Sequence, residues 1–256
     1  MITGSLLLGL TLLPVFLLML FVYFQDKYQK EPIKTLLKAF FAGMLAIVFT
    51  MVLDFLIDLT LGNIPVLSNT VFYDAFLTAG IPEELSKFLI FMIFIWRDKN
   101  FDEYFDGIVY ACFISLGFAC LENIMYVFDA TIISLAGGFI TSILRAVLSV
   151  PGHFLFGVIL GYFLSMAKFH PEKRGRYIWT GLLLAMLAHG LFDWLLMVAD
   201  SLSTGMMLVV YAFFIIGDIG LWLCGIRLIR KQQHNSLQQK NEAEATFTEN
   251  EFNQTY

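Results

Sequence analysis

Long apolar runs follow one another along almost the whole chain and are separated by short polar segments. A helix needs about 20 apolar residues to cross the ~30 Å hydrocarbon core of a bilayer. Seven runs are long enough, at residues 2–24, 35–60, 73–96, 104–128, 149–168, 177–199 and 205–229. The sequence therefore predicts an all-α polytopic membrane protein with about seven transmembrane helices, bundled together in the bilayer.

Three segments need separate interpretation. The first run is longer than the apolar part of a signal peptide and no basic residues precede it, so we expect it to remain as a helix. Residues 129–148 contain Gly137, Gly138 and Arg145, and they could form a loop, an interfacial helix or a re-entrant segment. Residues 231–256 have almost no aliphatic side chains and cannot bury enough apolar surface to fold alone. We expect a helical domain over residues 1–230 and a disordered cytoplasmic tail over residues 231–256.

Basic residues indicate the orientation of the helices. Thirteen of the 16 lysines and arginines fall in the loops after the first, third and fifth predicted spans and in the tail. Of the other three, Lys38 and Lys87 lie within spans, and Arg145 falls on the opposite side. The positive-inside rule then places the N-terminus outside and the C-terminus in the cytoplasm. An eighth span at residues 129–148 would remove this asymmetry, so seven spans are favoured.

Composition agrees with a multi-pass protein of the cell (inner) membrane. The chain is 59% hydrophobic and 14% charged, with a mean hydropathy of +0.76, whereas a soluble domain carries roughly 25% charged residues. A net charge of −5 argues against a nucleic-acid partner. The lipid bilayer is the first partner that the chain implies. Cys112, Cys120 and Cys224 lie in apolar runs without CxxC spacing and are interpreted as small core residues.

Four groups of ionisable residues lie inside the predicted spans. A charge near the bilayer centre costs at least ~2.5–3.5 kcal/mol on insertion scales, so several charges on several helices indicate a polar site within the membrane. The polar residues of these groups are Glu83, Glu84, Lys87, Glu122, Asn123, His153, His189 and Asp193.

The four groups are expected at a similar depth. With a helical rise of ~1.5 Å per residue, Glu83 lies ~20 Å, Glu122 ~27 Å, His153 ~22 Å and His189 ~18 Å from the cytoplasmic ends of their spans. All four then fall in one layer in the outer half of the membrane. The helices are therefore expected to surround a shared polar site.

Local spacing predicts which groups face each other. Glu83 with Lys87, and His189 with Asp193, are four residues apart and lie on one helix face. Glu84 is about 100° further round its helix, so its direction is open on spacing alone. The glycines at positions 157 and 161 continue the face of His153 and would allow close helix packing beside it.

One interpretation of these residues is peptide hydrolysis without a cofactor. Glu83 or Glu84 would activate a water molecule, and His153 and His189 would polarise the carbonyl or carry protons. Asn123 could donate a hydrogen bond to an oxyanion or satisfy a neighbouring helix.

The second interpretation is metal-assisted hydrolysis with the same residue types. His153 and His189 with Glu122 or Asp193 would form a three-ligand zinc site with an open position. The chain has no HExxH and no GxSxG motif. The residues alone do not separate the metal mechanism from the glutamate mechanism.

The order of these motifs resembles the PrsW family of bacterial membrane proteases, which is distantly related to the type II CAAX prenyl proteases. The motifs are EExxK at 83–87, FxxxEN at 118–123, HxxxG at 153–157 and HxxxD at 189–193, and the DGIVY sequence at 106–110 is also similar. The likeness covers roughly residues 30–200.

The resemblance implies an intramembrane endopeptidase. Its functional residues would be Glu83, Glu84, Glu122, His153 and His189, with Lys87, Asn123 and Asp193 in support. It also implies a single-pass membrane protein as substrate, because family members make the first cut in an anti-sigma factor under envelope stress.

Two other functions use the same residues. A proton-coupled transporter or channel could employ the Glu, Lys and His side chains as a proton relay, although the sequence shows no inverted repeat. A non-enzymatic membrane scaffold would tolerate alanine at all four motifs. The substrate, the cut site, the activating signal and the oligomeric state are not determined by the sequence.

Overall fold

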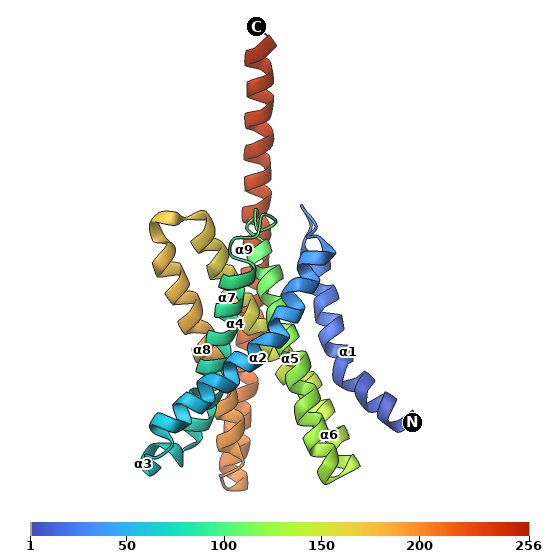
Figure 1. The fold of residues 1–256 in the computed structure, drawn as a ribbon, viewed down its shortest axis with the longest axis vertical. Coiled ribbons are helices and arrows are strands. Elements are labelled where there is room, and N and C mark those ends of the chain that lie inside the picture. Colours follow the sequence, from blue (N-terminus) through green and yellow to red (C-terminus); the bar gives the residue numbers. More distant parts are fainter. Residues whose placement is uncertain (1, 256) are drawn as a thin grey trace.

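The computed structural model describes the backbone of residues 2–255 and the side chains of residues 4–247, and every regular element within these residues is a helix. The two chain ends lie at opposite ends of the molecule, and the last helix extends beyond the bundle (Figure 1). The elements are α1 (Ile2–Gln25), α2 (Ile33–Leu61), α3 (Pro65–Ser68), the π-helix η1 (Tyr73–Gly80), α4 (Ile81–Phe94), α5 (Asp106–Ile133), α6 (Leu135–Val147), α7 (Ser149–Phe169), the 3₁₀ turn η2 (Pro171–Lys173), α8 (Arg174–Ala199) and α9 (Thr204–Thr255).

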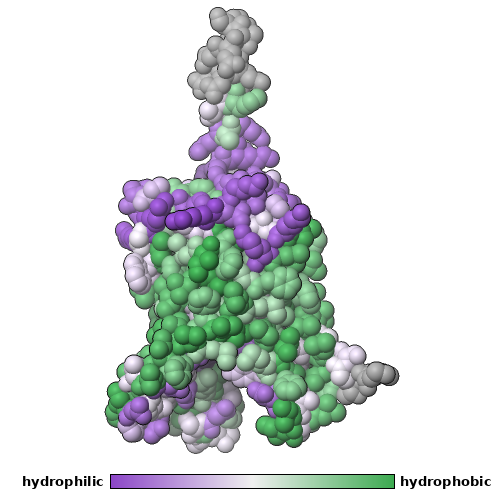
Figure 2. Space-filling model, in the orientation of Figure 1, coloured by the Kyte–Doolittle hydropathy of each residue, from purple (hydrophilic) through white to green (hydrophobic). Residues whose placement is uncertain are grey.

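Six helical segments within the described residues are long and apolar enough to cross a membrane. They are Gly4–Gln25, Ile33–Leu61, Asp106–Ile133, Leu135–Phe169, Pro171–Ala199 and Thr204–Phe247. The predicted span at 73–96 is divided between η1 and α4, and neither part alone reaches the length of a span. The surface shows a broad apolar region with polar residues gathered where α9 leaves the bundle (Figure 2). The all-α polytopic membrane fold is confirmed, and the count of seven spans and the orientation stay predictions.

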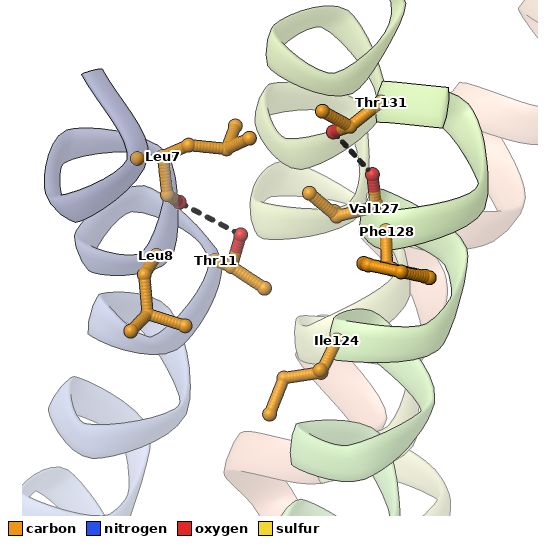
Figure 3. A pocket seen from close by; sticks show the side chains of 8 residues that line it. Leu7, Leu8, Thr11, Ile124, Val127, Phe128 and Thr131 are labelled. Atoms are coloured by element: carbon orange, nitrogen blue, oxygen red, sulfur yellow. Dashed lines mark hydrogen bonds between the residues drawn. The ribbon is translucent and has the colours of Figure 1, made fainter. Parts of the chain in front are cut away.

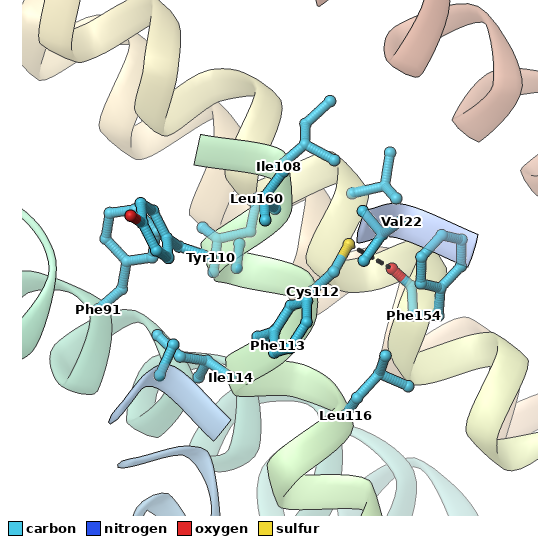
Figure 4. Close-up of a cluster of buried hydrophobic side chains, with 14 of the residues drawn as sticks. Val22, Phe91, Ile108, Tyr110, Cys112, Phe113, Ile114, Leu116, Phe154 and Leu160 are labelled. Carbon is cyan, nitrogen blue, oxygen red and sulfur yellow. Dashed lines mark hydrogen bonds between the residues drawn. The ribbon is translucent and has the colours of Figure 1, made fainter. Parts of the chain in front are cut away.

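Helix α5 forms the centre of the bundle, because α2 and α7 pack along its length and α1 and α4 also contact it. Figure 4 shows Cys112 and Leu116 of α5 among apolar side chains from α1, α4 and α7. The thiol of Cys112 lies 3.7 Å from the Phe154 carbonyl oxygen. The predicted core positions of Cys112 and Cys120 are confirmed, whereas Cys224 lies exposed on α9, so that prediction was wrong.

Glycines allow α5 to approach its neighbours closely. A Cβ atom on Gly161 of α7 would lie 2.3 Å from the carbonyl oxygen of Gly107 in α5, and one on Gly157 would lie 3.0 Å from the Ser115 Cβ. The first distance is too short for a larger residue without displacement of a helix, and the second would require a neighbouring atom to move by a few tenths of an ångström. The expected small-residue face of α7 next to His153 is therefore confirmed, and it fixes α7 against α5.

Residues 129–148, whose form the sequence left open, belong to two helices. Helix α5 continues to Ile133, and the Ser134 hydroxyl caps α6 by accepting the N–H of Gly137 at 2.9 Å. Helix α6 has 13 residues, and it runs almost directly into α7. It contacts α1 and α5. The segment therefore extends α5 at its C-terminal end and places α6 directly before α7. Arg145 lies on α6.

A mostly apolar pocket lies beside the N-terminal part of α1. The pocket has a volume of about 180 Å³ and lies between α1 and α5 (Figure 3). The hydroxyls of Thr11 and Thr131 donate to carbonyl oxygens of their own helices, at 2.8 and 2.6 Å. The rest of the lining is apolar, so this pocket offers little polar chemistry.

The region after residue 230 differs from the expected disordered tail, because α9 continues as one helix through it. Polar side chains at its start bond to other segments instead of burying apolar surface. Gln232 donates to the Tyr162 carbonyl (3.3 Å), Gln233 to the Gln25 carbonyl (2.5 Å) and Gln239 to the Asp102 carbonyl (2.8 Å), and Ser236 accepts the Phe105 N–H (2.9 Å). The composition of this region predicts that it cannot fold by itself. In the structure its hydrogen-bond partners are supplied by the rest of the bundle.

Candidate functional site

The two adjacent glutamates are positioned by a close contact between η1 and α8. The π-helix η1 runs directly into α4, and Pro82 stands in the first turn of α4, where its missing N–H is tolerated. A Cβ atom on Gly80 would lie 2.7 Å from the backbone nitrogen of Gly190. This approach brings Glu83 and Glu84 next to His189, the residue before Gly190.

Lys87 joins three of the four motifs. Its ammonium donates to Glu84 Oε1 at 2.7 Å, to Glu83 Oε2 at 3.3 Å and to His153 Nδ1 at 3.0 Å. It also lies 4.2 Å from the centre of the Phe118 ring. A fully buried ammonium requires such partners, because a desolvated charge without them is costly. Glu84, whose direction spacing left open, thus faces the same cluster as Glu83.

His189 is held on both sides of its ring. Its Nδ1 lies 2.9 Å from Glu84 Oε1, and its Nε2 lies 3.2 Å from Asp193 Oδ2 and 3.8 Å from Glu83 Oε2. The ring stacks on Phe156 with a centroid distance of 4.7 Å. These contacts restrict the imidazole to one orientation, with its Nε2 toward Glu83 and Asp193.

His153 connects Lys87 to Glu122. When Lys87 donates to Nδ1, the imidazole hydrogen resides on Nε2, which then donates to Glu122 Oε2 at 2.8 Å. The His153 and His189 rings meet edge to face, with centroids 5.2 Å apart. The two histidines are therefore neighbours across α7 and α8.

Arg145 is a site residue that sequence reasoning missed. Its guanidinium donates to Glu122 Oε2 and to the Asn123 amide oxygen, both at 2.6 Å, and stacks 4.1 Å over the Tyr126 ring. The Asn123 oxygen is thus engaged by a neighbouring helix. A signal existed, because Arg145 is the one basic residue that the span assignment placed on the outer side. The role of Arg145 was missed because residues 129–148 were not assigned to a helix.

A cavity of about 500 Å³ lies against this cluster. Glu83, Glu122, His153, His189 and Asp193 line it, together with Arg145 and apolar side chains, and it extends to Asp200 and Tyr211 at the end opposite the tail. Figure 2 shows the molecule hollowed at this end. Glu84, Lys87 and Asn123 do not line the cavity. They lie behind the residues that do, where they can orient but not touch a substrate.

The cluster suits a metal ion. Glu83, His153 and His189 each offer a donor atom, and these atoms lie within 4.8 Å of one another. Two histidines and a glutamate, with an open position, form a common zinc ligand set. Glu84 contacts the Nδ1 of His189, as a carboxylate does when it orients a histidine ligand. The sequence paired the histidines with Glu122 or Asp193, but the donor atom that the structure groups with both is on Glu83.

The charges agree with a divalent ion. Glu83, Glu84, Glu122 and Asp193 carry four negative charges, and Lys87 and Arg145 carry two positive charges, which leaves −2 with neutral histidines. Such a site needs either protons or a cation to offset the excess.

Comparisons with known proteins agree on one family. A profile described as PrsW family intramembrane metalloprotease matches residues 31–217. The chain is similar to the Protease PrsW of Geobacillus kaustophilus, with 35% identity over 84% of this chain and 86% of the relative. It is also similar to those of Clostridioides difficile (32% identity, 89% and 91% coverage) and Bacillus subtilis (32%, 88% and 95%). No solved structure gives a significant match.

Proposed function

We propose a site and a substrate class for this chain, starting from the fact that it belongs to the PrsW family of intramembrane metalloproteases. It is a multi-pass membrane protease. Membership of a protease family does not support the alternative function of a transporter. The observation that carries our proposal is the set of carboxylates and histidines that line the cavity of about 500 Å³. A peptide bond that enters this cavity would meet these groups together.

Three cavity residues form the donor set for the metal that the family implies. Glu83, His153 and His189 would hold it, and His153 would give up its hydrogen bond to Lys87 or to Glu122 to free a ring nitrogen. When bound, the metal would polarise a carbonyl and make a bound water easier to deprotonate. Glu84 and Asp193 fix the ring of His189, and Lys87 in turn fixes Glu84. We assign Glu84 and Lys87 as positioning residues, since neither lines the cavity.

Glu122 is our candidate for the proton-transferring group. It is one of the carboxylates that line the cavity, and its Oε2 accepts a hydrogen bond from Arg145 at 2.6 Å. A carboxylate fixed in this way can take a proton from the attacking water and return it to the leaving amine. Glu83 would take this role on the glutamate mechanism that uses no cofactor.

The test is cleavage by purified protein reconstituted with a single-pass membrane substrate. We expect Glu122→Gln and His153→Ala to abolish product, and chelation to abolish it until zinc is returned. Metal analysis should show about one equivalent in the wild type and loss of it in His153→Ala. Glu172→Gln is the control, because Glu172 is exposed in η2 and pairs loosely with Lys173 at 4.0 Å.

Cleavage by both Glu122→Gln and His153→Ala at the wild-type rate would contradict the assigned site. Full activity after complete metal removal would contradict the metal assignment alone and favour Glu83 as the group that activates water. Thermal unfolding of each variant separates loss of chemistry from loss of fold.

The substrate that we favour is an anti-sigma factor with one membrane span. The family resemblance supports this choice, and the cavity supports a cut near the outer face, because it extends to the α8–α9 connection. In cells that lack the protease, we expect the full-length anti-sigma factor to accumulate under envelope stress. A normal rate of first cleavage in those cells would exclude this substrate.

A further inference from the structure

A second group of acidic residues lies far from the cavity, at the end of the bundle from which α9 extends. Asp26 and Glu31 lie between α1 and α2, Asp102 and Glu103 precede α5, and Asp106 is its first residue. All except Asp102 are buried. Among the described residues, none of the five forms an ion pair with a lysine, arginine or histidine. Five carboxylates therefore share this region without a paired positive charge.

Nearby lysines are engaged elsewhere. Lys30 donates to the carbonyl of Tyr23 and lies over that ring, 4.6 Å from its centre. Lys168 donates to the Trp96 carbonyl at 2.9 Å. Lys240 lines a pocket together with Asp102 and Glu103, and its ammonium lies 3.9 Å from Glu244 Oε1. In the described part of the chain, none of these three lysines forms an ion pair with the acidic cluster.

Three of the carboxylates converge on one point. Oxygen atoms of Glu31, Asp102 and Asp106 lie within 4.8 Å of one another. Each accepts at least one hydrogen bond. Tyr110 Oη donates to Glu31, and Gln29 Nε2 donates to Asp102 at 3.0 Å. The backbone N–H groups of Asp102 and Glu103 donate to Asp106 at 2.9 and 2.7 Å. Hydrogen bonds thus hold the three carboxylates together despite their mutual repulsion.

Several buried oxygens in the same region have no hydrogen-bond partner among the residues that the structure describes. They are Oδ1 of Asp106, Oδ1 of Asp26 and Oε1 of Glu103. Buried polar atoms are rarely left without partners, because desolvation is then not compensated. The carboxyl groups of Glu31 and Asp106 lie within hydrogen-bond reach of each other, as do those of Asp26 and Glu103. Two carboxyl groups this close need either a shared proton or a cation between them.

We propose that Glu31, Asp102 and Asp106 bind a divalent cation with a preference for oxygen ligands, Ca²⁺ or Mg²⁺. Hard cations of this kind are bound by carboxylates and carbonyls and tolerate several anionic ligands at once. Asp102 is exposed and provides access from water, while the buried Glu31 and Asp106 supply charge. The ion links the α1–α2 connection to the start of α5.

The experiment uses the purified full chain in detergent after chelation. Titration with CaCl₂ and with MgCl₂, followed by calorimetry and thermal unfolding, should show about one saturable site for at least one ion and a higher Tm on binding. Asp102→Asn should weaken the affinity by at least about tenfold, because one anionic ligand is lost. Asp106→Asn should abolish binding. Glu172→Gln, which removes an exposed carboxylate in η2, should bind as the wild type does.

The same titrations on the His153→Ala variant separate this site from the cavity. That variant should keep its response to Ca²⁺ or Mg²⁺, and loss of the response would place the ion at the cavity and overturn the proposal. The proposal is also overturned if neither Ca²⁺ nor Mg²⁺ binds, or if Asp102→Asn and Glu172→Gln bind the ion equally well. Protons shared between the carboxyl groups would then explain how the acidic residues lie so close together. Asp102 is exposed, so its variant remains informative even where Asp106→Asn fails to fold.

Discussion

Arg145 shows how one side chain can hold a neighbouring carboxylate in place while it also lines the cavity. Its planar guanidinium bonds Glu122 and Asn123 at the same time, and the Tyr126 ring supports it from one side. Lysine cannot reproduce this fork of two parallel donors. We therefore assign Arg145 as a positioning residue for Glu122, on a helix that carries none of the four motifs.

Arg145→Ala should lower kcat by about 100-fold and change KM little, because displacement of a reacting group by about 1 Å costs on that order. Arg145→Lys should recover only part of kcat. Steady-state kinetics with a membrane substrate measures both constants. Arg176→Ala is the control, since Arg176 is exposed at the start of α8. An unchanged kcat in Arg145→Ala would refute the positioning role.

Helix contacts determine whether the four motifs meet. The α5–α7 contact depends on Gly107 and Gly161, and His153 lies on α7 two turns before Gly161. The η1–α8 contact depends on Gly80 and Gly190, next to the glutamates and His189. Each pair lets two backbones approach, so the chemistry of the site depends on residues that have no side chain.

Gly161→Ala should destabilise the fold by about 1–3 kcal/mol, as overpacking of a close contact does. Its new Cβ would lie 2.3 Å from the Gly107 carbonyl oxygen, so α7 must shift and carry His153 with it. Thermal unfolding and cleavage assays should both report a loss. Gly217→Ala is the matched control in α9, because no heavy atom lies within 4 Å of the position that its Cβ would take. Equal Tm values for the two variants would refute the packing argument.

For the whole molecule, the start of the region after residue 230 acts as a clamp on three other segments. It bonds the end of α1, the loop before α5 and α7 through five side-chain hydrogen bonds. Each such bond contributes a net ~0.5–1.5 kcal/mol. This part of α9 thus belongs to the fold and not to a separate tail.

Shortening the chain to end at Arg230 should lower the Tm, whereas ending it at Asn241 should leave the Tm nearly unchanged. The first truncation removes all five bonds and the second removes none of them. Scanning fluorimetry of the two truncated proteins in one detergent makes the comparison. Identical Tm values would show that these contacts contribute nothing to stability.

The orientation of the bundle is a further prediction at this scale. In a chain whose three cysteines are replaced by serine, Ser203→Cys should react with a membrane-impermeant thiol reagent in intact cells, and Asn241→Cys should not. Both positions are exposed, with Ser203 just before α9 and Asn241 far along it. The reverse labelling pattern would place the N-terminus in the cytoplasm and contradict the charge asymmetry of the loops.

Local pattern alone determined the membrane class and the contacts within each helix. The length of an apolar run is a property of one segment, and spacing of four residues paired Glu83 with Lys87 and His189 with Asp193, now at 3.3 and 3.2 Å. The ordered motifs also identified the family, which the match to known relatives confirms. These inferences need only helical periodicity and knowledge of the residue types.

Tertiary structure alone decided which remote groups meet. It turned Glu84 toward His189, grouped Glu83 with the two histidines, brought Arg145 to Glu122 and gathered Glu31 with Asp106. These contacts join different segments of the chain. They depend on how each helix is rotated and how closely its neighbours approach, which the packing of whole helices determines and the periodicity of any one segment does not.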